Sequence, residues 1–211
     1  MKIYIGSDHA GFALKEKLKI FIKELGYEVE DKGAFSLEPT DDYPDFIIPV
    51  AKEVALHPDS LGIILGGSGE GEQISANKID GVRAIEYYGG NLEIVKLGRE
   101  HNDANVLSLG VRFIEEEEGK EAIKIFINTP FSNEERHVRR LKEIGKINKN
   151  FKILYYIGTL ILFIIGLIFY VLKTSSIEEF PKKINYLELW PIFILIIFIS
   201  LFIIKANRKI K

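Results

Sequence analysis

The sequence predicts an α/β domain built on a parallel sheet, followed by a separate apolar C-terminal region. Two observations carry this prediction. Short apolar runs alternate with segments of helical periodicity through the first part of the chain, which is typical of βαβ units. The composition then changes near Phe151: acidic residues outnumber basic ones before it, and basic residues outnumber acidic ones after it. At 211 residues the chain is long enough for one domain with an appendage.

Five short apolar runs have the length and composition of buried strands. Helices expected between them would cover both faces of the resulting five-stranded sheet. The predicted strands are residues 2–6, 27–31, 62–65, 82–85 and 105–109.

Helical periodicity fills the intervals between these strands. The clearest case is the first, where apolar residues recur at i, i+4, i+7 and i+8 and Gly26 follows as a C-cap. This apolar stripe consists of Leu14, Leu18, Phe21, Ile22 and Leu25. Further helices are predicted at residues 43–56, 70–77, 89–97 and 115–128.

Another helix is predicted to begin near Ser132. The sequence Ser132-Asn-Glu-Glu135 is typical of a capping box and follows Pro130. In this helix Arg136 and Arg140 lie one turn apart on the same face, with His137 beside them.

Ligands of parallel sheets bind at the carboxyl ends of the strands. Three polar turns, at residues 6–11, 66–72 and 99–103, are therefore expected to gather at one edge of the sheet.

The C-terminal region is predicted to be a membrane hairpin of residues 148–211. Residues 153–172 carry no charge and match the ~20 residues needed to cross the hydrocarbon layer. A second apolar run covers about 187–204, and aromatic residues lie near the ends of both runs. The alternative, two buried helices of a soluble domain, is weaker because no large core remains to cover them. Lysines and arginines flank the outer ends of both runs, which predicts a two-span membrane protein with the N-terminal domain and the C-terminus cytoplasmic.

The glycine-rich segment Gly66-Gly-Ser-Gly-Glu-Gly-Glu-Gln73 directly follows the third predicted strand. It differs from a Walker A loop, because Glu72 stands where that motif needs lysine, and it also fails the G-x-G-x-x-G pattern. Its backbone N–H groups suit a transient anion such as an enediolate, for which Glu72 or Glu70 would be the base. The alternative is an ordinary strand–helix turn with solvated glutamates, and the loop alone leaves both readings open.

Three of the four histidines lie beside other polar groups. His9 follows Asp8, His101 precedes Asn102, and His137 stands among arginines, whereas His57 lies in an ordinary loop and is given no role. An Asp–His pair can move protons, and paired arginines suit a phosphate monoester. The alternative for the arginines is a basic patch attracted to anionic lipid, a reading that the lysines of residues 142–152 fit better.

Several classes of function are disfavoured. The chain has no cysteine, so it has neither a disulfide framework nor a thiolate metal site. The scattered His and Asp residues lack a local metal-ligand spacing. Nucleic-acid binding is disfavoured because the N-terminal domain is acidic and has no basic–aromatic stripe.

Five motifs together resemble the sugar-phosphate isomerases of the ribose-5-phosphate isomerase B type, a family that includes galactose-6-phosphate isomerase subunits. They are "GSDHAG" (6–11), "DDYPD" (41–45), "GGSGEGEQISANK" (66–78), "REHNDANVLSLGVR" (99–112) and "TPFSNEERHVRR" (129–140). The resemblance covers about residues 1–147 and leaves the predicted hairpin outside.

The resemblance implies a Rossmann-like three-layer α/β/α sandwich, a homodimer with shared active sites, and aldose–ketose isomerisation without metal or organic cofactor. It implies that Asp8 and His101 assist ring opening and proton movement. Groups around the phosphate would be His9, Arg112, Arg136, His137 and Arg140. An anion hole would be formed by Gly67, Ser68, Gly69 and Gly71, and Tyr43 and Asn102 would line the sugar site.

One departure from the family pattern identifies the base. Many members place a cysteine base at the position of Gly66, and this chain instead resembles the branch with "GSGxGEQ", which makes Glu72 the base. Glu70 then occupies the variable position and is expected to be solvated.

The expected activity is the interconversion of D-ribose 5-phosphate and D-ribulose 5-phosphate at a membrane. One alternative keeps the chemistry and changes the substrate to a hexose 6-phosphate such as allose or galactose 6-phosphate. The other is a non-catalytic membrane-bound sensor of sugar phosphates.

Overall fold

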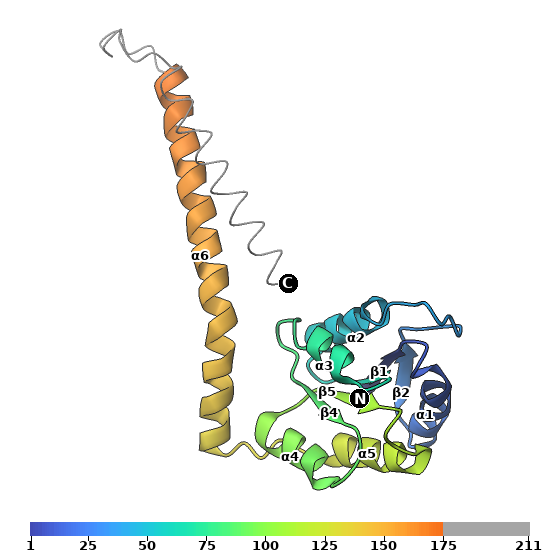
Figure 1. Ribbon diagram of the computed structural model, residues 1–211. Helices are drawn as coiled ribbons and strands as arrows, with labels where there is room; N and C mark the ends of the chain where they lie inside the picture. The colour runs from blue at the N-terminus through green and yellow to red at the C-terminus, as the bar shows by residue number, and fades with distance from the viewer. Residues whose placement is uncertain (175–211) are drawn as a thin grey trace. The chain divides into compact units, whose positions relative to one another are not determined.

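A five-stranded, fully parallel sheet forms the centre of the first part of the chain (Figure 1). The structure, a computed structural model, describes residues 1–174, without the side chains of 146–155, 157 and 167–174. Contacts divide the chain into two units, Met1–Gly145 and a second that begins at Lys146. The strand order is β2-β1-β3-β5-β4. The strands are β1 (Lys2–Ser7), β2 (Glu28–Asp31), β3 (Leu61–Gly66), β4 (Ala84–Tyr87) and β5 (Val106–Gly110).

Helices cover both faces of this sheet (Figure 1). One apolar core joins α1, α4 and α5 to the sheet, and a second joins α2 and α3 to the other face. The predicted Rossmann-like α/β class with a five-stranded parallel sheet is therefore confirmed. The helices are α1 (Phe12–Glu24), α2 (Pro44–Leu56), α3 (Glu70–Ala76), α4 (Glu93–Asn102), α5 (Glu116–Asn128) and α6 (Glu135–Thr174).

Local sequence signals explain most of these elements. Leu18 and Ile22 of the predicted α1 stripe are fully buried, and Gly26 takes φ +88° directly after the helix, as a terminating glycine does. Strands β3 and β5 are buried along their whole length because each has a strand on both sides and helices on both faces.

The prediction that three polar turns share one edge of the sheet is wrong for residues 99–103. The turns at 6–11 and 66–72 follow β1 and β3, at the carboxyl edge. His101 and Asn102 instead form the last turn of α4, which returns the chain to the start of β5 at the amino edge. Strands of five or six residues are about 17–20 Å long, which separates the two edges.

Helix α4 also begins later than residue 89, where the sequence placed it. Gly89 and Gly90 have φ of +108° and +95°, a conformation that a right-handed helix cannot use, and the helix starts at Glu93. The helix also ends later than predicted, at Asn102 and not at residue 97, so that His101 is helical.

The predicted membrane hairpin is not supported. Residues 153–172 are the second half of α6, whose first half carries many charged residues, and they do not form a helix of their own. Over the described residues, no helix combines the length and the apolar character needed to cross a bilayer. The predicted two-span membrane location is therefore contradicted, and the predicted lipid partner is not supported; the second predicted span, 187–204, lies outside the described residues.

Candidate active site

The glycine turn between β3 and α3 lies at the carboxyl edge, where side chains of neighbouring segments border it. Gly69 has φ +85°, which favours glycine, and lets the chain turn into α3. A Cβ added at Gly67 would lie 2.9 Å from Cζ of Arg112, and one at Gly71 would lie 2.8 Å from Cζ of Tyr43. Arg112 and Tyr43 therefore border the turn directly. The side chain of Ser68, in the same turn, is exposed to solvent.

Glu72 is the buried acid of this turn, with only 4% of its surface exposed. Burial raises the pKa of Glu72; its own backbone N–H opposes that shift and the negative charge of Asp8 adds to it. Asp8 is buried as well and accepts a hydrogen bond from the N–H of Gly11 at 3.1 Å. A carboxylate with a raised pKa, open toward a glycine turn, has the properties of a general base.

His9 is oriented by Asp41, which the sequence analysis did not single out. The Nδ1 atom of His9 lies 2.6 Å from Oδ1 of Asp41, and the backbone N–H of His9 donates to the same oxygen at 3.1 Å. The hydrogen bond with Asp41 raises the pKa of His9, burial opposes the shift, and Asp8 adds to it. The arrangement favours an imidazolium, with Nδ1 held by Asp41 and Nε2 on the other side of the ring as a donor for an anion.

The same three side chains bring potential metal ligands close together. One ligand atom each from Asp8, His9 and Asp41 lies within 4.8 Å of the others. Two ligands of a tetrahedral zinc ion, at bond lengths of about 2.0–2.1 Å, are separated by roughly 3.3 Å. The 2.6 Å separation of His9 and Asp41 is shorter, so this pair has the geometry of a hydrogen bond.

A second group of candidate residues lies at the amino edge. The rings of His101 and His137 are 4.3 Å apart between centroids. His137 is buried, and its Nδ1 lies 3.0 Å from the hydroxyl of Ser132. The predicted capping box is therefore wrong in detail: α6 begins at Glu135, and the Ser132 hydroxyl contacts His137 and the N–H of Glu134.

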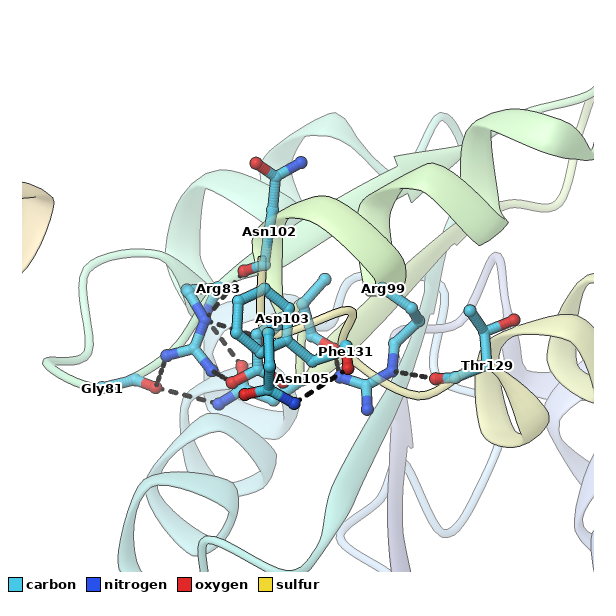
Figure 2. A network of polar contacts seen from close by, with 10 residues as sticks. Gly81, Arg83, Arg99, Asn102, Asp103, Asn105, Thr129 and Phe131 are labelled. Carbon is cyan, nitrogen blue, oxygen red and sulfur yellow. Dashed lines mark hydrogen bonds and ion pairs between the residues drawn. The ribbon is translucent and has the colours of Figure 1, made fainter. Parts of the chain in front are cut away.

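A polar network fixes the end of α4 that carries His101 and Asn102 (Figure 2). Arg83 donates to the carbonyl oxygens of Asn102 and Asp103 at 3.1 and 2.7 Å and pairs with the Asp103 carboxylate at 2.6 Å. Arg99 contacts the other Asp103 oxygen at 3.2 Å and the carbonyl of Thr129 at 3.2 Å. Asp103 itself takes φ +45° as the helix ends. The network therefore joins the end of α4 to the start of β4 and to the segment before α6.

The arginines of α6 complete the group at the amino edge. Arg136 and Arg140 are both exposed and lie one turn apart, as the sequence predicted. Nε of Arg136 lies 2.7 Å from the carboxylate of Glu134, a pair exposed to solvent that an incoming anion can replace.

The candidate residues thus fall into two groups on opposite edges of one sheet. The first group, at the carboxyl edge, comprises Asp8, His9, Tyr43, Gly67, Ser68, Gly69, Gly71, Glu72 and Arg112. The second, at the amino edge, comprises His101, Asn102, Arg136, His137 and Arg140. Within one chain the structure does not bring the two groups together.

Comparison with known proteins identifies the family. The profile of the Ribose/Galactose Isomerase family matches residues 3–144. This chain belongs to the ribose/galactose isomerase family. It is 44% identical over 149 residues to ribose-5-phosphate isomerase B of Mycolicibacterium paratuberculosis, covering 71% of this chain and 92% of that protein. The corresponding protein of Mycobacterium tuberculosis is 41% identical, with 71% and 91% covered.

Solved structures of the ribose/galactose isomerase family share this fold. Ribose-5-phosphate isomerase B of Clostridium thermocellum is 40% identical, with a TM-score of 0.67 over 71% of this chain and 99% of that one. The Mycoplasma genitalium enzyme, solved with bound ribulose 5-phosphate, is 36% identical, with a TM-score of 0.67 over 70% of this chain and 96% of that one.

Sequence reasoning missed two acidic residues of the candidate site in this family member. Asp41, which lies within the "DDYPD" motif, contacts His9 from 32 residues away. Glu86 lies on β4 beneath Gly69, and a carboxylate in the short apolar run "AIEY" was the available signal.

Proposed function

We propose that this chain interconverts D-ribose 5-phosphate and D-ribulose 5-phosphate through an enediolate, with Glu72 as the base. Its family membership, and ribose-5-phosphate isomerase B relatives at 40–44% identity, support the reaction. The single structural observation that carries the role of Glu72 is its buried carboxylate with a raised pKa, placed against the glycine turn.

The proposed chemistry is a proton transfer between neighbouring carbons. Glu72 removes the proton from C2 of the open-chain aldose, the electron pair of the C–H bond forms the C1–C2 double bond, and the carbonyl oxygen at C1 takes the negative charge. Backbone N–H groups of Gly67, Ser68, Gly69 and Gly71 hold this enediolate. Glu72 then returns the proton to C1, the hydroxyl at C2 gives up its proton and becomes the ketone, and the oxygen at C1 takes up a proton and becomes a hydroxyl. Asp8 and His101 assist ring opening before this step.

The phosphate is bound by cationic groups in the same proposal. Arg112 lies against the glycine turn and His9 is held by Asp41, so both are available at the carboxyl edge. Arg136 and Arg140 supply guanidinium groups from α6, with His137 behind them. Tyr43 and Asn102 line the sugar.

This assignment requires a second copy of the chain. Because the two residue groups lie at opposite edges of the sheet, one chain cannot place Glu72 and His101 on the same sugar. A homodimer with two shared sites completes each one, with the carboxyl-edge group from one chain and the amino-edge group from its partner. Tyr88 and Phe113, exposed and 6.3 Å apart between ring centroids, lie beside the glycine turn and offer apolar surface for this interface.

Turnover of ribose 5-phosphate by the purified protein tests the activity. We expect D-ribulose 5-phosphate to form, and Glu72→Gln to lose nearly all isomerisation while phosphate affinity is largely kept. Ligand binding without turnover in the wild type would overturn the enzyme assignment. Preference for allose 6-phosphate or galactose 6-phosphate would move the substrate to a hexose.

Mixed dimers test the shared site. When Glu72→Gln and His101→Gln chains are mixed, each mixed dimer regains one intact site, so about a quarter of wild-type activity returns. A mixture of Glu72→Gln and Asp8→Asn chains is the matched control, because both changes lie at the same edge and no intact site forms. Equal activity in the two mixtures would contradict the arrangement. We further propose that residues 1–147 form the isomerase domain; turnover by this fragment is the expected result.

A further inference from the structure

Glu86 is an acidic side chain on β4, directly beneath the glycine turn. Ala84 and Glu86 face the same side of the sheet, since side chains alternate along a strand, and Ala84 belongs to the core that α2 and α3 cover. The carbonyl of Ala84 accepts hydrogen bonds from the side chains of Gln73, in α3, and of Asn77, the residue that caps the C-terminal end of this helix. Glu86, two residues further along the strand, therefore lies under the start of α3.

The carboxyl group of Glu86 contacts the turn itself. A Cβ added at Gly69 would overlap Oε1 of Glu86 and would lie 3.0 Å from the hydroxyl of Ser108, the residue paired with Glu86 on β5. Only glycine at position 69 leaves room for this carboxyl. The Ser108 hydroxyl donates to the carbonyl of Gly69 at 2.8 Å, so its proton is not available to Glu86.

Both Glu86 oxygens are inaccessible to solvent, and no N–H or hydroxyl group of the described residues donates to them. Their hydrogen-bonding contact is with the Glu70 carboxyl, which requires a proton between the two groups and raises the pKa of Glu86 further. The titratable groups that face it are Glu70 and Glu72 of α3; β5 contributes only the Ser108 hydroxyl. Burial raises the pKa of Glu86 to about 8, and the carboxylates of Glu70 and Glu72 add to the shift. No cation from the described part of the chain contributes to it. Near pH 7 the group therefore carries a proton.

We propose that Glu86 is a positioning residue whose neutral carboxylic acid keeps the floor of the glycine turn uncharged, so that the turn can hold the negative charge of the reaction intermediate. Ionisation of Glu86 places a buried charge beneath Gly69, next to the place where the enediolate forms. The negative charges of an ionised Glu86 and of the enediolate would repel each other strongly, because a partly buried site screens them less than water does. The expected consequence is an alkaline limit to turnover that Glu86 sets. This inference rests on the proposed isomerase function.

The pH dependence of kcat tests the proposal. In the wild type we expect kcat to fall roughly tenfold or more from about pH 7 to about pH 9.5, following one ionisation. Glu86→Gln cannot ionise, so the ratio of kcat at these two pH values should approach one. Glu70→Gln removes a charge that raises the Glu86 pKa, so the decline should move to lower pH. An unchanged alkaline decline in Glu86→Gln would overturn the proposal, and a residue that only supports the fold would leave the profile in place.

Infrared spectroscopy gives a second readout that does not depend on turnover. The difference between wild type and Glu86→Gln should contain a protonated carboxyl band at pH 7 that titrates near pH 8. Should Glu86→Gln fail to fold, the same band measured in wild type and Glu70→Gln must titrate at lower pH in the variant. Absence of the band at pH 7 would overturn the proposal. A wild type with the band but without isomerase turnover would instead overturn the proposed function.

Discussion

The carboxylate of Glu72 occupies the space in which a side chain at position 66 would begin. A Cβ added at Gly66 would overlap Cδ and both carboxylate oxygens of Glu72. Gly66 is the last residue of β3, so the missing side chain lets Glu72 fold back from α3 over the strand end. A side chain at position 66 and the Glu72 carboxylate therefore cannot both occupy this point.

Gly66→Ala should displace the base without removing it. The new methyl group forces the Glu72 carboxylate off its position, and we expect kcat to fall by roughly 100-fold, a typical contribution of a general base. The KM should change little, because the new methyl group meets the Glu72 carboxylate and none of the phosphate-binding side chains. Gly145→Ala is the matched control, since no atom lies within 4 Å of a Cβ at that position. Steady-state kinetics of both variants measure the difference, and wild-type kcat in Gly66→Ala would show that Glu72 tolerates displacement.

The raised pKa of Glu72 should govern the acid side of the activity profile and also affect stability. The base must be ionised, so kcat/KM should decline as the pH falls through a value above that of an ordinary glutamate. A group whose pKa is raised by folding stabilises the protein below its unfolded pKa, and this contribution is lost as the pH rises through the folded pKa. Glu72→Gln should therefore unfold at higher urea concentration than the wild type at pH 7, with little difference near pH 4. Equal midpoints at both pH values would contradict the burial of an ionised carboxylate.

The features of the site that are local in sequence could be predicted. Spacing within a few residues was enough to predict the glycine turn and the acid at position 72. It also placed Arg136 and Arg140 one turn apart on one helix. The alternation of apolar runs with helical stripes was enough to predict the parallel sheet, because both faces of such a sheet need cover.

Other features depend on tertiary structure and could not be read in this way. The start of α4 depends on the backbone conformation of Gly89 and Gly90. The contact between Asp41 and His9 joins residues that are 32 positions apart. The pairing that places Glu86 beneath Gly69 requires the order of β4 and β5, which no local pattern specifies.

Asp41→Asn should weaken phosphate binding through His9. The hydrogen bond with Asp41 raises the pKa of His9, so the wild-type imidazole remains cationic at a higher pH than an ordinary histidine. An amide at position 41 provides no negative charge, and the variant should lose the His9 charge at lower pH. We expect KM for the sugar phosphate to rise several-fold between about pH 6 and pH 8 in the variant and less in the wild type. NMR titration of His9 measures the cause directly; the same His9 pKa in both proteins would contradict the prediction. Asp42→Asn, at an exposed neighbouring carboxylate, is the control.

The ion pair of Lys15 and Asp31 should dominate the stability of the β1–β2 side of the domain. Lys15 is fully buried, and its Nζ donates to both Asp31 oxygens at 2.8 and 2.7 Å and to the carbonyl of Ala34 at 2.7 Å. Asp31→Asn leaves this ammonium without its buried counter-charge, which typically costs about 3–5 kcal/mol. Lys23→Met, at an exposed lysine of the same helix, should change stability by less than about 0.5 kcal/mol.

The pH dependence of unfolding tests the same pair. Burial opposes the shift, but hydrogen bonds from Lys15 and Lys19 lower the pKa of Asp31 overall. A carboxylate with a lowered pKa contributes stability above its unfolded pKa, and that contribution is lost as the pH falls through the folded value. Urea midpoints of wild type and Asp31→Asn should therefore differ most at pH 7 and converge in acid, because protonated aspartic acid and asparagine both leave Lys15 with only the half-exposed Glu16, 3.1 Å away, as a possible counter-charge. If the difference between the two urea midpoints stayed constant at pH values where Asp31 is protonated, Asp31 would stabilise the fold through packing and not through its charge.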